Sequence, residues 1–273
     1  MGTRSKFWAL CALVCTVLVG CGSSTTSSNA TAPPSTAPPS TAPAGTPALT
    51  GTVTVFAASS LTESFTELGK QFEAAHPGVS VKFNFGASST LATQLTQGAP
   101  ADVFASASAT NMAAVVTAGQ AANPTTFAKN SMEIVTPPNN PANIAAVADL
   151  AKPGVKVALC QAQVPCGVTA AKVFANAGVT VTATTYGADV KAVLTTVELG
   201  EVDAGMVYVT DAQAAAAKVK AIAIPAAQNA STAYPIAALT KAPNPAGAAA
   251  FEAFVLSPSG QTVLAKAGFS PGS

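Results

Sequence analysis

The feature that most constrains the fold is an alternation of strand-like and helix-like segments that begins at Thr52. The β-branched run TVTVFAA is followed by apolar residues at helical spacing, namely Leu61, Phe65, Leu68 and Phe72. VSVKFNF then predicts a second strand, FGASSTLATQL a short helix and ADVFASA a third strand. This order of strand, helix, strand, helix and strand indicates a parallel sheet with right-handed crossovers. We therefore predict an α/β fold.

A second series of alternating segments begins near Ser131. MEIVTP, VKVALC, VDAGMVYV and KAIAIP predict strands with helical segments between them, and the chain ends in the strand TAYPIAAL and two helices. If this last strand joins the sheet of TVTVFAA, the chain crosses twice between two lobes. The two crossovers would form a hinge beside a ligand cleft. The predicted lobes are residues 51–129 plus 229–273, and residues 130–228.

The N-terminal part has the pattern of an export and anchoring signal. Residues 1–20 combine Arg4 and Lys6 with an apolar stretch that is too short to predict a membrane span. The stretch ends in LVGC, which resembles the bacterial lipobox, so Cys21 is the predicted site of lipidation. Residues 21–50 are rich in Ser, Thr, Pro and Ala and predict a disordered tether. We expect an exported protein, lipid-anchored to the outer face of the cytoplasmic membrane in the cell envelope or periplasm; an ordinary signal peptide or a short anchor is the alternative.

The chain carries little charge. Only 9% of the 273 residues are charged, the formal net charge is +1, and the single arginine, Arg4, lies in the predicted signal. Because there is no basic patch interleaved with aromatic residues, nucleic acid is not an expected partner. Without an arginine, the folded part also lacks a bidentate guanidinium clamp for a carboxylate or phosphate.

Two of the five cysteines remain for the folded part. Cys11 and Cys15 lie in the predicted signal, and Cys21 would carry the lipid. Cys160 and Cys166, both in CQAQVPC, predict a disulfide that closes a small loop in an exported protein. Their spacing is not the CxxC of a redox enzyme, and two thiols with one distant histidine are poor zinc ligands.

Four predicted strand-to-helix turns are candidate binding elements, and they lie at Ser60, at Ser88, at Cys166 with Gly167, and at Asp189 with Val190. Each helix start has unpaired backbone N–H groups and the positive end of a helix dipole, so convergent starts would bind an anion. Each also has a purely structural interpretation. Ser60 fits a capping box with Glu63, Ser88 or Ser89 could cap the next helix, and Asp189 is a common N-cap residue. Tyr208, in GMVYVTDA, could likewise be an ordinary half-buried strand residue.

Several stretches are similar to one family. VTVFAASSLTESF, FGASSTLATQL, GAPADVFASAS, VPCG, YGADVKAVL, GEVDAGMVY and TDA, between Val53 and Phe269, resemble the molybdate-binding protein of bacterial molybdate ABC transporters. The resemblance implies the two-lobed periplasmic-binding-protein fold of the second type. It also implies capture of molybdate, and of tungstate, for delivery to the integral-membrane permease of an ABC importer. We expect a monomer that is not an enzyme and has no cofactor beyond this oxyanion ligand.

The resemblance implies five ligand contacts. Ser60 and Ser88 match serines that donate through their hydroxyl and backbone N–H groups, with Ser59 and Ser89 as one-residue alternatives. Cys166 and Val190 match backbone N–H donors, and Tyr208 matches a phenol donor. The predicted contact residues are therefore Ser60, Ser88, Cys166, Val190 and Tyr208. Cys166 departs from the family, which often has Ala at this position.

Three other functions stay open. A receptor for sulfate, phosphate or an organic anion would have the same fold. A hydrolase with Ser60 or Ser88 as nucleophile would need a base within reach, and His76 lies at the far end of the helix that follows Ser60. A structural envelope lipoprotein would bind no oxyanion.

Overall fold

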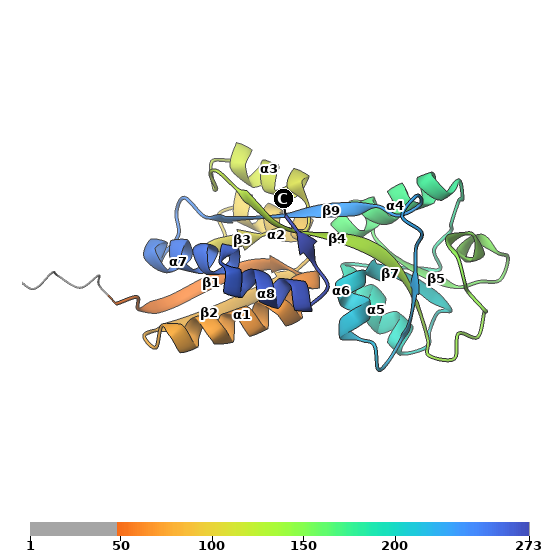
Figure 1. Cartoon of the computed structure of the whole chain (residues 1–273). Helices are drawn as coiled ribbons and strands as arrows, with labels where there is room; N and C mark the ends of the chain where they lie inside the picture. The colour runs from red at the N-terminus through yellow and green to blue at the C-terminus, as the bar shows by residue number, and fades with distance from the viewer. Residues whose placement is uncertain (1–47, 273) are drawn as a thin grey trace, which may run out of the picture. The chain divides into compact units, whose positions relative to one another are not determined.

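The computed structural model describes residues 48–272 of the chain (Figure 1). The predicted signal segment, Cys21 and nearly all of the predicted tether lie outside the described residues. Within residues 48–272, no helix combines the length and the apolar character that a membrane crossing requires.

In the described part of the chain, ten strands form one continuous sheet. They are β1 (Gly51–Ala58), β2 (Val79–Gly86), β3 (Val103–Ala105), β4 (Thr125–Thr136), β5 (Val157–Cys160), β6 (Thr185–Gly187), β7 (Ala204–Tyr208), β8 (Lys220–Ala223), β9 (Ser231–Ala238) and β10 (Ser270–Pro271). Their order is β2-β1-β3-β9-β4-β7-β5-β6, with β8 and β10 also paired to β4. β1 is parallel to β2 and β3, as predicted, and β5 is parallel to β6 and β7.

The described helices cover the faces of this sheet. They are α1 (Thr62–Ala75), α2 (Ser88–Thr96), α3 (Ala109–Thr117), α4 (Pro165–Ala177), α5 (Val190–Glu198), α6 (Val209–Ala214), α7 (Pro245–Leu256) and α8 (Pro258–Lys266), with 3₁₀ helices η1 (Ser59–Leu61) and η2 (Val147–Ala151). In α1, the predicted apolar face is confirmed, because Phe65, Leu68 and Phe72 are fully buried. The sequence analysis did not predict α3, β6 or β10.

The apolar side chains of the described residues form two main cores. One core packs α1, α7 and α8 against β1, β3 and β9, and aromatic rings such as Phe65, Phe72 and Phe251 fill it. The other packs α4 and α5 against β4, β5 and β7. Figure 1 shows the corresponding two groups of helices at opposite ends of the long strands β4 and β9. A smaller cluster joins α2 and α3 to the opposite face of the first group of strands.

β4 and β9 connect the two groups of elements. β4 pairs with β9 from Thr125 to Ser131 and with β7 from Met132 to Val135. The other end of β9 pairs with β3, so β9 shares the sheet of β1, as predicted. The predicted two-lobed α/β architecture is therefore confirmed, while the lobe limits at residues 129 and 229 stay a prediction.

Candidate functional site

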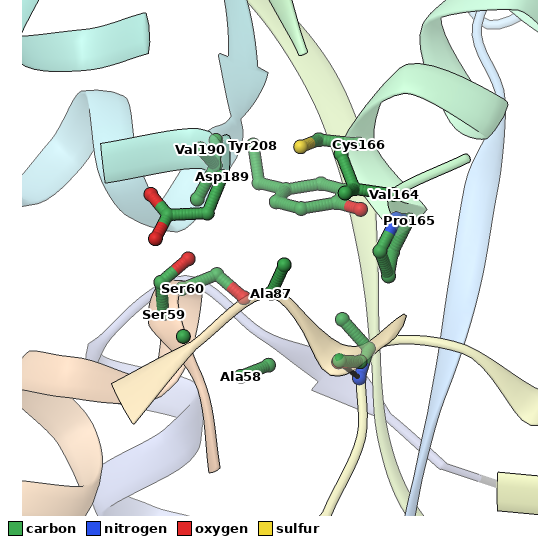
Figure 2. A pocket seen from close by; sticks show the side chains of 13 residues that line it. Ala58, Ser59, Ser60, Ala87, Val164, Pro165, Cys166, Asp189, Val190 and Tyr208 are labelled. Atoms are coloured by element: carbon green, nitrogen blue, oxygen red, sulfur yellow. Dashed lines mark hydrogen bonds between the residues drawn. The ribbon is translucent and has the colours of Figure 1, made fainter. Parts of the chain in front are cut away.

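A small cavity lies between the two groups of elements, with 13 residues drawn around it in Figure 2. Its volume is about 10 Å³, the space of about one water molecule, well below the roughly 300–1,000 Å³ of pockets for drug-sized ligands. The lining residues are Ala58, Ser59, Ser60, Gly86, Ala87, Ser88, Ala107, Val164, Pro165, Cys166, Asp189, Val190 and Tyr208. All five predicted contact residues are therefore brought to one small cavity.

The starts of four helical segments meet at this cavity. Ser60 belongs to η1, Ser88 begins α2, Cys166 lies in the first turn of α4, and Val190 begins α5. The first backbone N–H groups of a helix have no acceptor within the helix. The four residues are nearly inaccessible, with exposed fractions of 1–4%. Because buried N–H groups without an acceptor are costly, this arrangement is suited to an anion that accepts from several helix ends at once.

The hydroxyl groups of the two serines do not cap their helices. The N-cap of α1 is Leu61 and the N-cap of α2 is Ala87, and neither helix start has a side-chain cap. The capping interpretations of Ser60 and Ser88 are therefore wrong. Instead, Ser88 Oγ accepts a hydrogen bond of 2.9 Å from the backbone N–H of Ala107, which leaves the hydroxyl proton of Ser88 available to a ligand.

The predicted disulfide is present and holds the first turn of α4. It joins Cys166 to Cys160, the last residue of β5. A side chain at position 167 would overlap the carbonyl oxygen of Gln161, so Gly167 allows the small loop to close. The helix begins at Pro165, one residue before the turn predicted at Cys166 and Gly167, and proline fits this first position because no N–H is needed there. With its thiol in the disulfide, Cys166 offers the cavity its backbone N–H.

Tyr208 is a buried donor without a partner. It lies at the end of β7, its exposed fraction is 1%, and its hydroxyl makes no hydrogen bond of good geometry to a described residue. The Thr169 hydroxyl lies near it but donates to the carbonyl oxygen of Pro165. Burial raises the pKa of Tyr208, so the phenol keeps its proton. Figure 2 shows its ring across the cavity from Ala58 and Ala87. The interpretation of Tyr208 as a half-buried strand residue is therefore wrong, and its hydroxyl lacks the acceptor that a buried donor needs.

Asp189 is the only carboxylate among the lining residues, and no lysine, arginine or histidine is among them. It is the N-cap of α5, as its type predicts, and its Oδ1 accepts from the backbone N–H of Ala192 at 3.0 Å. The cavity wall thus contains many donors and one carboxylate, of which Oδ1 already has a partner.

An ion cluster that the sequence analysis missed lies beside the site. Lys191 Nζ is 2.8 Å from both carboxylate oxygens of Glu63 and 2.9 Å from Asp211 Oδ1. Burial raises the pKa of Asp211 to about 6, although Lys191 acts in the opposite direction. Burial alone would lower the pKa of Lys191, but Asp211 and Glu63 together raise it. The sequence offers one indication of this cluster. Lys191 follows the predicted contact Val190 directly, and Glu63 lies three residues after the predicted contact Ser60.

Comparisons with known proteins agree with this geometry. Residues 53–270 match the family model described as bacterial extracellular solute-binding protein. The molybdate-binding protein ModA of Mycobacterium tuberculosis (strain ATCC 25618 / H37Rv) is 41% identical over 260 residues, which cover 95% of each chain.

Two solved structures share the fold. The periplasmic molybdate-binding protein of Azotobacter vinelandii has a TM-score of 0.71 at 21% identity, over 80% of this chain and 98% of that one. The sulfate-binding protein SubI of M. tuberculosis H37Rv also has a TM-score of 0.71, at 20% identity, over 81% of this chain and 86% of that one. These likenesses confirm the periplasmic-binding-protein fold of the second type, and fold alone does not separate the two ligands. From the family model and the ModA relative, the chain belongs to the bacterial extracellular solute-binding proteins, in the group that includes the molybdate-binding protein ModA.

Proposed function

We propose that the protein captures molybdate, and equally tungstate, outside the cytoplasm and delivers it to the permease of an ABC importer. The observation that carries this proposal is the buried Tyr208 hydroxyl, which lacks an acceptor and lies in the same cavity as four helix starts. A tetrahedral oxyanion supplies several acceptors at once. The 41% identity to a ModA protein supports molybdate as this oxyanion.

The proposed contacts are the hydroxyl and backbone N–H groups of Ser60 and Ser88, the backbone N–H groups of Cys166 and Val190, and the Tyr208 hydroxyl. Hydrogen bonds from these donors to an anion are charge-assisted, and exclusion of water by the closed lobes strengthens them. Hydrogen phosphate carries a P–O–H group that needs an acceptor, and leaving it unpaired costs about 1–3 kcal/mol. Among the lining side chains, Asp189 has the one carboxylate; its Oδ1 caps α5, and its Oδ2 would be the acceptor for this proton. We expect selection against phosphate because all five proposed contact residues act as donors.

Sulfate has the charge of molybdate but is a smaller tetrahedron. A cage that is fixed by helix starts would lengthen several hydrogen bonds to sulfate at once, and hydrogen bonds weaken steeply with poor geometry. Molybdate and tungstate are nearly equal in size, so the same cage would hold both.

The location follows from the N-terminal sequence. The LVGC pattern supports lipidation of Cys21, and residues 21–50 would tether the binding unit to the outer face of the membrane. Cys21→Ser is expected to release the protein into the soluble fraction or to leave an unprocessed precursor. Membrane fractionation with mass measurement of the wild-type N-terminus tests this, and an unmodified, membrane-bound wild type would contradict it.

A thermal melting scan with single oxyanions tests the proposed ligand. A ligand at roughly 1,000 times its dissociation constant stabilises the folded state by about 4 kcal/mol. Molybdate and tungstate in the sub-millimolar range should raise the melting temperature clearly, and equal concentrations of sulfate or phosphate should not. A larger rise in melting temperature with sulfate or phosphate than with molybdate would identify that anion as the ligand instead. A structural lipoprotein would respond to none of the four.

Among the described residues, neither serine of the hydrolase alternative has a hydrogen bond to a histidine, a lysine or a carboxylate. The hydroxyl of Ser60 contacts Tyr234 and that of Ser88 contacts Ala107, and His76 packs on Phe72 at the end of α1. Nucleophilic serines need an adjacent general base. We therefore propose a binding protein without enzymatic activity, and ester hydrolysis that is lost in Ser60→Ala or Ser88→Ala would contradict this.

A further inference from the structure

A buried series of hydrogen bonds lies behind the cavity and includes three side chains that do not line it. Ser60 Oγ is 2.8 Å from the hydroxyl of Tyr234. Asn130 Nδ2 donates to the same Tyr234 hydroxyl at 3.5 Å and to Thr210 Oγ1 at 2.8 Å. All four side chains are buried, and Tyr234 has an exposed fraction of 0%. Tyr234 lies on β9 and Asn130 on β4, the two strands that cross between the lobes.

The direction of these hydrogen bonds follows from the amide of Asn130. Asn130 Oδ1 accepts from the backbone N–H of Ser131 at 3.1 Å, so the amide nitrogen is the end that faces Thr210 and Tyr234. An amide nitrogen only donates, so the oxygen of Tyr234 accepts at this contact. The proton of the buried Tyr234 hydroxyl then needs an acceptor, and among the described residues Ser60 Oγ is the one within hydrogen-bond distance. Tyr234 therefore donates to Ser60.

The hydroxyl of Ser60 is left with its own proton, and Ser60 lines the cavity. Its oxygen accepts from Tyr234, so the proton of the Ser60 hydroxyl is free to be donated to a ligand. The Tyr234 ring is fixed by Phe127 and Phe269, with centroid distances of 6.2 Å and 5.2 Å. It also meets the ring of Tyr208 edge-on at 6.2 Å, so one side chain supports two proposed contacts.

We propose that Tyr234 is a positioning and specificity-determining residue for the oxyanion site: its hydroxyl, oriented by Asn130, fixes the Ser60 hydroxyl as a donor toward the ligand. This inference rests on the proposed function. Two consequences follow from it. The donor chain strengthens the hydrogen bond from Ser60 to an anion, because linked hydrogen bonds polarise one another. It also occupies one of the two acceptor positions of Ser60 Oγ, which reduces the capacity of Ser60 to accept from a protonated oxyanion such as hydrogen phosphate.

A double-mutant cycle tests the assignment. Molybdate affinity is measured by titration calorimetry on the wild type, Tyr234→Phe, Ser60→Ala and the double variant, with melting curves of each unliganded protein. Tyr234→Phe should weaken binding about 5- to 10-fold when Ser60 is present and less than about twofold in Ser60→Ala, since residues that act through one another are not additive. Tyr186→Phe is the matched control, because Tyr186 has an exposed fraction of 57% and is not part of the network; its affinity should equal that of the wild type.

The ratio of the affinities for molybdate and hydrogen phosphate is a second measurement. This ratio would not change if Tyr234 only supported the fold. In Tyr234→Phe, Ser60 Oγ gains a second open acceptor position and its hydroxyl is no longer oriented, so the preference for molybdate over hydrogen phosphate should narrow. If Tyr234→Phe does not fold, Asn130→Ala takes its place in the cycle, because it removes the donor that sets the direction. Equal weakening with and without Ser60, or no weakening, would overturn the inference.

Binding measurements on the wild type test the proposed function independently of the role of Tyr234. If the wild type binds another oxyanion instead of molybdate, the same cycle is run with that oxyanion and still decides the role of Tyr234. If the wild type binds none of molybdate, tungstate, sulfate and phosphate, both the proposed function and the inference are overturned.

Discussion

The Tyr208 hydroxyl has different consequences for folding and for binding. It is buried without a hydrogen-bond partner among the described residues. Leaving a buried polar group unpaired costs about 1–3 kcal/mol, so Tyr208→Phe should leave the melting temperature of the unliganded protein unchanged or raise it. The same change removes a donor to the anion and should weaken molybdate binding by roughly tenfold or more. Melting curves and calorimetric titration check both effects, and a lower unliganded melting temperature with unchanged affinity would contradict them.

Ser88→Ala provides the contrasting case. Ser88 Oγ accepts from the backbone N–H of Ala107, so its removal also leaves a buried donor unpaired. We expect weaker molybdate binding together with a lower melting temperature of the unliganded protein. If Ser88→Ala lowered only the affinity, the contact with Ala107 would contribute nothing to folding.

Asp211 makes the stability depend on pH. Burial raises its pKa from 3.8 to about 6 in the folded protein. The folded protein therefore holds a proton that the unfolded chain releases, so the contribution of Asp211 to the free energy of unfolding is fully present below about pH 4 and is lost as the pH rises through about 6. The melting temperature of the wild type relative to Asp211→Asn should fall between about pH 4 and pH 6.5 and then level off. A difference that rose over this range would mean that the folded protein favours the ionised carboxylate.

At the scale of elements, the disulfide attaches the first turn of α4 to the end of β5. A disulfide that closes so small a loop stabilises the fold by roughly 2 kcal/mol in the chain-entropy account. Replacing both cysteines by serine should lower the melting temperature and also weaken molybdate binding, because the backbone N–H of Cys166 is a proposed contact. Val255→Ala is the control, since this fully buried residue of α7 lies outside the cavity. If both variants lose stability but keep wild-type affinity, α4 does not depend on the disulfide for its position.

The elements differ in how well the sequence predicts them. α1 follows from its apolar spacing, α4 and α5 from the predicted strand-to-helix turns, and β1, β2 and β7 from runs that contain β-branched residues. β6 has only three residues, and the first half of β4 is defined by its pairing with β9, so neither has a strong local pattern. The site residues on helix starts could be predicted because a turn is a local signal and the family resemblance assigned them. Tyr234 could not, because its contact with Ser60 spans 174 positions in the sequence.

At the scale of the whole molecule, we expect the two lobes to separate when the ligand is released. Contacts that link one lobe to the other would then be broken. Glu63 lies on α1, which packs in one core, and Lys191 lies on α5, which packs in the other. Their ion pair stands beside the cavity, one residue after the proposed contact Val190. Opening of the lobes would separate Glu63 from Lys191, while Lys191 and Asp211 would stay together because both belong to the same lobe.

We therefore expect Glu63→Gln to speed up ligand release. The side chain of Glu63 is 52% exposed, and exposed pairs contribute about 0.2–1 kcal/mol, so the rate of molybdate dissociation should rise by about 1.5- to 5-fold. Salt screens such a pair, and added salt should speed up release from the wild type more than from the variant. Glu198→Gln is the matched control, because Glu198 pairs with Lys218 at 3.0 Å within one lobe, and its loss should leave the dissociation rate unchanged. Stopped-flow displacement of molybdate by excess tungstate measures these rates, and equal effects of the two substitutions would show that the ion pair between the lobes does not hold them closed.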